Sequence, residues 1–190
     1  MKTIKNNIEN EIVIKNSKFI CLLIKINDID ISNYLENIKK QYPKATHYCY
    51  AYIYNDYKKS SDDGEPSSTA GIPILNVLEK NNLNNILCIV VRYFGGIKLG
   101  AGGLVRAYTK CVTECLKKSE LVELINGYKI ELEFSYNELN NVNYILNKSN
   151  ILSKKFNNNI KYIVLLDKIT LNKLKKYNYK ILEYLYIEKV

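Results

Sequence analysis

Two motifs in the first half of the chain combine residue types that can do chemistry. The first, SSDDGEPSSTAG at residues 60–71, holds three carboxylates among turn-forming residues. The second, RYFGGIKLGAGGLVRAY at residues 92–108, holds five of the chain's eight glycines together with three cations. Glycines cluster where the backbone must take a positive φ or approach another group closely. These two motifs are the first places to look for a functional site.

The three carboxylates of the first motif leave several interpretations open; they are Asp62, Asp63 and Glu65. Oxygen ligands of this kind can hold Mg²⁺, and paired carboxylates can act as general acid and base. They can also cap the helix that follows, or pair with Arg92 and Arg106. Their spacing does not single out acid–base catalysis, and the loop contains no histidine. We favour capping and ion pairing, and we predict neither a metal nor a cofactor.

The glycine-rich motif predicts an anion site where a helix begins. Exposed N–H groups and the helix dipole at such a start favour a bound anion. Two cations four residues apart share one face of that helix, and a lysine precedes it in a turn. The predicted anion- or nucleic-acid-binding residues are Lys98, Gly100, Gly102, Gly103, Arg106 and Lys110.

A purely structural alternative for this motif is a tight strand-to-helix junction, in which the glycines serve packing alone, Gly95 and Gly96 included. The motif matches neither common phosphate-binding loop. No Gly-Lys-Ser/Thr follows it, as a Walker A loop requires, and Val105 stands where G-x-G-x-x-G has its last glycine.

His47 and Arg92 are polar residues in otherwise apolar or aromatic strands. His47 shares a strand face with Cys49 and Ala51, which favours a satisfied histidine at the rim of the core over a general base. A buried arginine needs partners, and the acidic motif is their obvious source for Arg92. Four alternating tyrosines can stack on bases, although ordinary packing explains them equally well: Tyr48, Tyr50, Tyr52 and Tyr54.

The hydrophobic pattern predicts an α+β protein of two domains, residues 1–126 and 127–190. After residue 126 the order of elements is strand, helix, strand, strand, helix, strand, which is that of a ferredoxin-like domain. In the first domain, strands are expected over 11–26 with a turn near 16–17, over 45–54 and over 85–94. Helices are expected from an N-cap at Ser32 to about Tyr42, after Pro73, and from the glycine-rich turn to about Ser119, with residues 55–71 as a long polar loop.

Composition limits the class of protein. The 190 residues carry a net charge of +9, which favours polyanionic partners. No apolar run reaches the roughly 18 residues of a membrane helix, and the first residues lack the apolar segment of a signal peptide. We therefore expect a cytoplasmic protein.

The five cysteines lie in apolar stretches without a C-x-x-C pair, which indicates buried, reduced thiols: Cys21, Cys49, Cys88, Cys111 and Cys115.

Both motifs, with THYCYAY at residues 46–52, resemble the YigZ/IMPACT family, in the family's order and over nearly the whole chain. The resemblance implies a first domain similar to domain IV of elongation factor G and to a domain of a small-subunit ribosomal protein, and a second similar to domain V. Eukaryotic relatives act in translational control and carry an extra N-terminal partner-binding domain, for which this chain has no room. One departure is Ser68, where the family's loop usually has glycine.

These features favour a non-enzymatic RNA- or ribosome-associated factor linked to regulation of translation. A basic surface would position the phosphate backbone. Two alternatives remain. One is an enzyme acting on an anionic small molecule, with His47 and the carboxylates of the acidic motif. The other is a protein-interaction module of the translational stress response.

Overall fold

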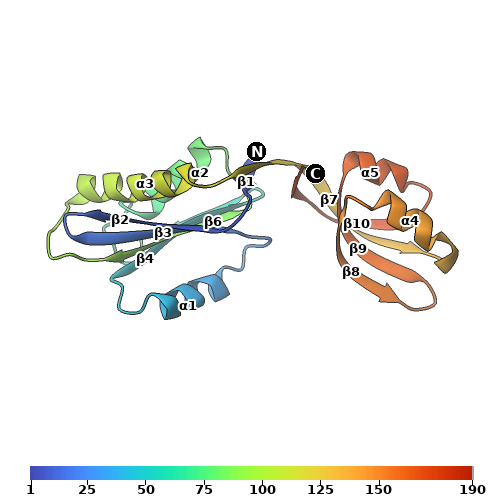
Figure 1. Cartoon of the computed structure of the whole chain (residues 1–190), viewed down its shortest axis with the longest axis horizontal. Coiled ribbons are helices and arrows are strands. Elements are labelled where there is room, and N and C mark those ends of the chain that lie inside the picture. The colour runs from blue at the N-terminus through green and yellow to red at the C-terminus, as the bar shows by residue number, and fades with distance from the viewer. Residues whose placement is uncertain (190) are drawn as a thin grey trace. The chain divides into compact units, whose positions relative to one another are not determined.

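The computed structural model describes residues 1–189 and divides into two compact units, Met1–Val122 and Glu123–Val190. The sequence predicts the division after residue 126. Strand β7 (Leu121–Phe134) passes through that point without a break, and the units separate after Val122. Each unit has a core of its own, packed on a sheet (Figure 1).

The first unit is built on one antiparallel sheet whose strands run in the order β2-β3-β6-β4-β5. The strands are β2 (Ile8–Ile14), β3 (Ser17–Lys25), β6 (Ile86–Tyr93), β4 (His47–Tyr54) and β5 (Tyr57–Ser61). A short strand, β1 (Lys2–Ile4), precedes them, and the Lys5 amide donates to the Glu120 carbonyl at 2.8 Å.

Helices cover both faces of this sheet (Figure 1). Helices α2 (Gly71–Lys80) and α3 (Ala101–Lys117) pack on one face, and α1 (Ser32–Gln41) packs on the other. Because both faces are covered, the central strand β6 is an unbroken apolar run up to its penultimate residue. The apolar stripe predicted for α3 is confirmed, since its members are all buried: Leu104, Tyr108, Cys111, Val112 and Cys115.

Strand β4 confirms the predicted alternation. Cys49, Ala51 and Ile53 face α2 and α3, whereas the four tyrosines belong to the cluster under α1. Tyr52 and Tyr54 are only 8% and 7% exposed, and the other two are half-buried. These tyrosines are therefore packing residues and form no open platform for bases.

Four local predictions need correction. The polar segment 55–71 is not all loop, because its first part pairs with β4 as β5 across a turn at Asn55 and Asp56. Helix α2 begins at Gly71, before Pro73. Ser32 is the first helical residue and not the N-cap, and its amide donates to the Asp30 carboxylate at 3.1 Å. Helix α3 ends at Lys117.

The second unit has the predicted ferredoxin-like order. After β7 come a 3₁₀ turn (Tyr136–Glu138), α4 (Leu139–Ile145), β8 (Asn150–Phe156), β9 (Ile160–Asp167), α5 (Lys168–Lys173) and β10 (Asn178–Glu188). The strands pair antiparallel in the order β10-β7-β9-β8. Alternate residues of the central strands form one core with both helices, as the period of two requires.

Among residues 1–189, no helix combines the length and the apolar character needed to cross a bilayer.

Candidate functional site

Asp62 organises the backbone that leads into α2. Its Oδ1 accepts N–H bonds from Ala70 at 2.9 Å and Gly71 at 2.8 Å, and its Oδ2 accepts one from Ser68 at 2.8 Å. The first residues of a helix have N–H groups without intrahelical partners. Asp62 accepts bonds from two such groups although it lies eight and nine residues earlier in the chain. These bonds keep residues 62–71 folded against the start of the helix.

Ser68 adopts the left-handed conformation that glycine would take without strain, with a φ of 61°. Such a conformation costs a serine about 1–2 kcal/mol. The bond from its amide to Asp62 offsets this cost. The loop therefore holds its turn despite the family glycine being absent.

Asp63 joins the same loop to β4. Its carboxylate accepts the Tyr48 amide at 2.7 Å, and its carbonyl accepts from His47 Nδ1 at 2.8 Å. Because a carbonyl can only accept, Nδ1 carries the proton, and Nε2 faces Glu65 Oε2 at 3.8 Å. His47 thus binds the loop through Nδ1 and lies beside the buried carboxylate of Glu65.

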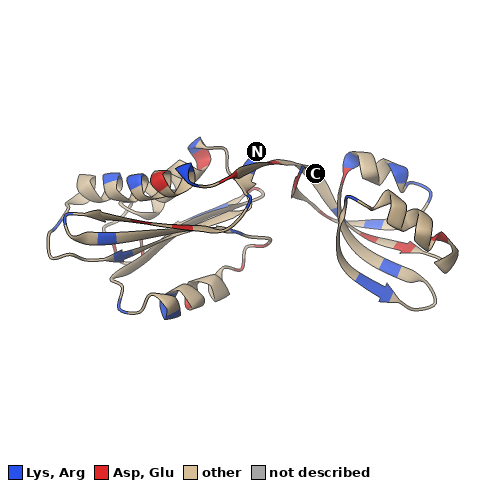
Figure 2. Ribbon diagram, viewed as in Figure 1, with Lys and Arg blue, Asp and Glu red and all other residues tan. Residues whose placement is uncertain are grey.

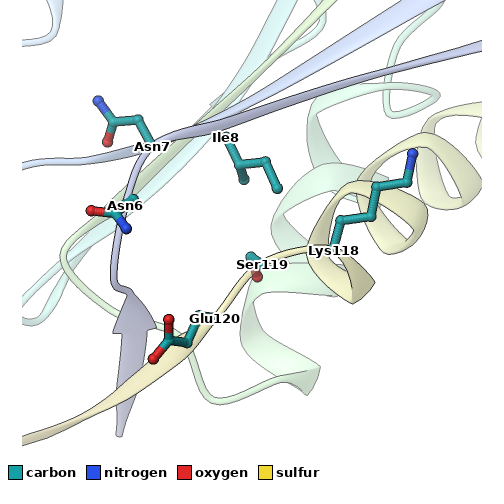
Figure 3. Close-up of a pocket in the computed structure, with 6 residues that line it drawn as sticks. All are labelled: Asn6, Asn7, Ile8, Lys118, Ser119 and Glu120. Atoms are coloured by element: carbon teal, nitrogen blue, oxygen red, sulfur yellow. The ribbon is translucent and has the colours of Figure 1, made fainter.

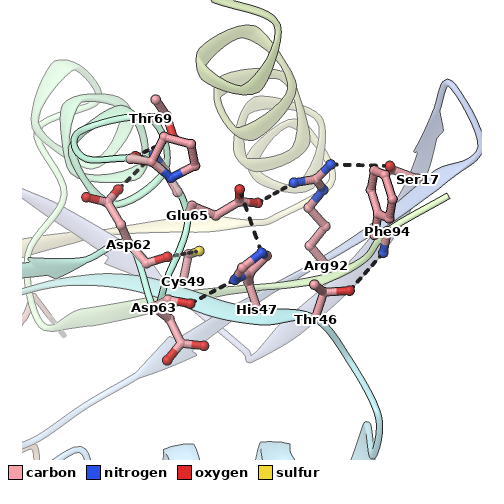
Figure 4. Close-up of polar contacts among 12 residues, drawn as sticks. Ser17, Thr46, His47, Cys49, Asp62, Asp63, Glu65, Thr69, Arg92 and Phe94 are labelled. Atoms are coloured by element: carbon pink, nitrogen blue, oxygen red, sulfur yellow. Dashed lines mark hydrogen bonds and ion pairs between the residues drawn. The ribbon is translucent and has the colours of Figure 1, made fainter. Parts of the chain in front are cut away.

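Glu65 is the buried centre of the network drawn in Figure 4. Its Oε1 accepts from Arg92 Nη1 at 2.6 Å and from the Tyr108 hydroxyl at 2.8 Å. The side chains of Glu65 and Arg92 are only 3% and 6% exposed. A buried charge pair of this kind requires both members, since either alone would be an uncompensated charge.

Arg92 is enclosed by groups from other elements. Its guanidinium lies 5.3 Å from the ring centre of Phe19 and 5.6 Å from that of Phe94, and Nη2 donates to Ser17 Oγ at 3.4 Å. Its buried Nε has no hydrogen-bond partner among residues 1–189. The arginine is held in place and is not available to a ligand through its paired nitrogens.

Two neutral groups complete the network. Burial raises the pKa of the Cys49 thiol to about 12, and burial, with Cys49 and Glu65 nearby, raises the pKa of Tyr108 far above its usual value. Cys49 Sγ lies 2.9 Å from the Asp62 carbonyl, to which the thiol donates. Both groups therefore remain protonated donors near neutral pH, and Cys49 is no thiolate nucleophile.

We expect Asp62→Asn to lower the free energy of unfolding by about 1–3 kcal/mol, because an amide NH₂ in place of one oxygen leaves a backbone N–H without its acceptor. Burial alone would raise the pKa of Asp62, but the three N–H bonds lower it below 3.8. This stabilisation is therefore complete above the ordinary pKa and is lost as the pH falls below it. Urea unfolding should show a smaller difference in the free energy of unfolding between wild type and variant at about pH 3 than at pH 7. Equal midpoints at pH 7 would contradict this role.

The glycines of the second motif serve two different purposes. Gly95 lies against the β2–β3 turn so closely that a Cβ would come within 2.1 Å of the Asn16 backbone. Gly96 and Gly100 take φ values of 83° and 70° with open space around them. Gly100 is the N-cap of α3, and its carbonyl accepts the Leu104 amide at 2.9 Å. Packing thus accounts for Gly95, and backbone conformation for Gly96 and Gly100.

The predicted cations lie on the surface around the start of α3. Lys98 and Arg106 are exposed, and neither forms an ion pair with a carboxylate of residues 1–189. Arg106 Nη1 lies 3.6 Å from the point a Cβ of Gly102 would occupy, so the guanidinium folds back over the first turn. Lys110 is exposed one turn further along the helix. The pKa of Glu114 is lowered mainly by Lys117, which donates a hydrogen bond to it, and to a smaller extent by Lys110.

The predicted site residues thus form two groups. His47, Asp62, Asp63, Glu65 and Arg92 make the polar network around the buried carboxylate. Lys98, Gly100, Gly102, Gly103 and Arg106 lie at the exposed start of α3, whereas Lys110 lies near the middle of that helix. The β6–α3 loop joins them through Gly95 and Gly96. Sequence reasoning missed Ser17 and Tyr108 as partners, because one is a small residue in a strand and the other belongs to the apolar stripe of a helix.

The described part of the chain contains no group of three or more His, Cys, Asp and Glu side chains arranged to hold a metal. A shallow pocket of about 230 Å³ lies beyond the end of α3 (Figure 3). Its lining residues are Asn6, Asn7, Ile8, Lys118, Ser119 and Glu120. None of them belongs to either group, and Glu120 is already paired with Lys5 at 2.8 Å.

Fold and site together define a class: an α+β protein in which a buried Glu–Arg pair anchors an acidic turn and a glycine-rich loop to one sheet. The profile of the Impact N-terminal domain matches residues 15–116. The chain is 38% identical over 159 residues to an IMPACT family member of Haemophilus influenzae, covering 80% of this chain and 77% of that protein. The chain therefore belongs to the IMPACT family.

Two further relatives extend this comparison. The chain is 50% identical over 125 residues to the IMPACT family member YvyE of Bacillus subtilis, which covers 64% of this chain but only 58% of YvyE. A crystal structure described only as that of a hypothetical protein covers 100% of this chain and 98% of its own, with a TM-score of 0.69 and 26% identity.

Proposed function

We propose that this chain is a cytoplasmic RNA- or ribosome-associated factor in the regulation of translation. The observation that carries the proposal is the exposed start of α3, where Lys98 and Arg106 have no carboxylate partner among residues 1–189. Helix α3 carries two further lysines, Lys110 and Lys117 (Figure 2). RNA or the ribosome as the partner is also supported by the net charge of +9. The family's resemblance to two domains of a ribosomal elongation factor supports it as well.

A backbone phosphate is the ligand that suits this place. Gly100 allows the chain to turn sharply into α3, and the first N–H groups of a helix favour an anion. The Arg106 guanidinium already lies over that turn, and it can bind a phosphate through two parallel N–H bonds. Contacts of this type position a nucleic acid without reading its sequence.

The carboxylates on which the enzyme alternative depends have structural roles in this fold. Asp62 and Asp63 accept backbone N–H bonds, and Glu65 is buried against Arg92. The thiol beside them is held protonated by burial. An acid–base pair must reach its substrate, but Glu65 is buried and both oxygens of Asp62 accept backbone N–H bonds.

The test is a salt titration of RNA binding by Lys98→Ala with Arg106→Ala. Each cation that contacts phosphate on single-stranded RNA contributes about 0.7 to the slope of log affinity against log salt, so the double variant should flatten it by about 1.4. It should also bind more weakly at low salt. A matched pair of substitutions, Lys154→Ala with Lys155→Ala on β8, removes the same charge from the second unit and should change the slope less. Unchanged affinity and slope in the first double variant would contradict the proposal.

A further inference from the structure

Phe94 is an exposed aromatic residue on a fixed backbone. Its side chain is 47% exposed, whereas the tyrosines of β4 are packed under α1. The Phe94 amide donates to Thr46 Oγ1 at 3.0 Å, and the next amide, that of Gly95, donates to Ser17 Oγ at 3.1 Å. The close approach of Gly95 to Asn16 holds the same loop against the β2–β3 turn. The ring is therefore presented to solvent from an anchored position.

The ring of Phe94 also rests on a cation. The Arg92 guanidinium lies 5.6 Å from the ring centre and is itself anchored by Glu65 (Figure 4). This contact occupies one side of the aromatic system and fixes its orientation. The exposed remainder of the ring offers an aromatic surface that loses little conformational freedom when a ligand binds.

Three loops bring exposed lysines to the neighbourhood of this ring. The Phe94 amide bonds to Thr46, and the Tyr93 hydroxyl donates to the Pro43 carbonyl at 3.2 Å, so the loop carrying Lys44 lies alongside. The β2–β3 turn, which includes Lys15, touches Gly95. The β6–α3 loop itself carries Lys98. Within residues 1–189, none of these three lysines forms an ion pair with a carboxylate.

We propose that Phe94 stacks on an unpaired base of single-stranded RNA, while Lys15, Lys44 and Lys98 bind the phosphates on either side. This inference rests on the function proposed above and specifies its substrate as unpaired RNA. Aromatic rings within a basic surface bind single strands because every base has a π-face, whatever the sequence. Bases inside a duplex are already stacked and cannot offer that face, so paired RNA is the poorer ligand.

A protein partner fits this surface less well. Stable protein interfaces bury about 800 Å² on each side around a centre from which charged residues are depleted. The β6–α3 loop exposes only two large apolar side chains, Phe94 at 47% and Ile97 at 45%, and exposed lysines lie on this loop and on the two loops beside it. So small an apolar area beside exposed cations matches a base flanked by phosphates.

The experiment compares Phe94→Ala with wild type on two probes, an oligouridylate of about twelve nucleotides and a perfectly paired RNA duplex of equal length. Loss of one stacked base should weaken binding of the oligouridylate about 5- to 150-fold. Its salt slope should stay unchanged, because a phenyl ring releases no counterions. Phe94→Tyr should restore most of the affinity, and Phe156→Ala, an exposed phenylalanine on β8, should have little effect.

The outcomes separate this inference from the proposed function. If wild type binds neither RNA, the RNA-binding part of the proposed function fails and the inference fails with it. If wild type binds but Phe94→Ala binds the oligouridylate equally well, only the inference is overturned. It is also overturned if the variant weakens both probes equally, since the ring would then act by positioning the loop. Loss of a protein partner from nuclease-treated lysate, with RNA binding unchanged, would overturn it in favour of a protein interface.

Discussion

Glu65→Ala is expected to lower the free energy of unfolding of the first unit by about 3–5 kcal/mol, the usual cost of removing one member of a buried ion pair. The substitution leaves the buried Arg92 guanidinium with a single hydrogen bond to residues 1–189, the 3.4 Å bond to Ser17 Oγ. It also removes the acceptor of the Tyr108 hydroxyl. Urea unfolding followed by circular dichroism gives the comparison with wild type.

Glu79→Ala is the matched control for burial. Glu79 pairs with Lys58 at 2.7 Å, nearly the distance of the Glu65–Arg92 pair, but the two side chains are 39% and 50% exposed. Exposed pairs contribute about 0–1 kcal/mol. The cost of Glu65→Ala should therefore exceed that of Glu79→Ala severalfold, and equal costs would contradict the role assigned to the buried pair.

A second comparison separates the lost pair from the charge left behind. Replacing both members with apolar residues, Glu65→Leu with Arg92→Met, leaves no unpaired charge. We expect this double variant to be more stable than Glu65→Ala. If it is no more stable, the loss comes from packing or from the Tyr108 bond and not from the stranded guanidinium.

Most helices and strands could be predicted from the sequence, because each of them follows from a local pattern of residues. The alternation in β4 places Cys49 and Ala51 on one face, and the helical spacing of α3 places Tyr108 and Cys111 on one stripe. The order of elements after residue 126 predicts the ferredoxin-like unit for the same reason. Strand β5 was missed because its sequence, YKKSS, has almost no apolar content and pairs only at the edge of the sheet.

The site could be predicted from the sequence only in part, because its hydrogen-bond and ion-pair partners come from segments far apart in the chain. The need of Arg92 for an anion follows from its place in an apolar strand, but the choice of Glu65 over its two neighbours depends on how the turn folds. The helical spacing of Tyr108 predicts a core residue, and only the structure shows that its hydroxyl donates to the Glu65 carboxylate. The exposure of Phe94 depends on tertiary packing, because its neighbour Tyr93 is half-buried and Tyr108, further along the same motif, is fully buried.

Gly95→Ala is expected to destabilise the first unit by about 3 kcal/mol or more, at the upper end for overpacked sites. A Cβ at Gly95 would lie 2.1 Å from the carbonyl carbon of Asn16 and 2.4 Å from the Ser17 nitrogen. Both are backbone atoms, so the β2–β3 turn and the β6–α3 loop must separate. That movement would also break the bond from the Gly95 amide to Ser17 Oγ. The midpoint of urea unfolding is the measurement.

Two other glycines of the same loop and helix give the controls. Gly96 has open space but a φ of 83°, so Gly96→Ala should cost only the conformational strain, about 1–2 kcal/mol. At Gly102 a Cβ would meet Arg106 Nη1 at an ordinary 3.6 Å, and alanine is the better helix former by about 1 kcal/mol. Gly102→Ala should therefore leave stability unchanged or raise it. The expected order of stability is Gly102→Ala, then Gly96→Ala, then Gly95→Ala. If Gly95→Ala is as stable as Gly102→Ala, the loop is not packed against the β2–β3 turn, and the anchored position of Phe94 is lost with it.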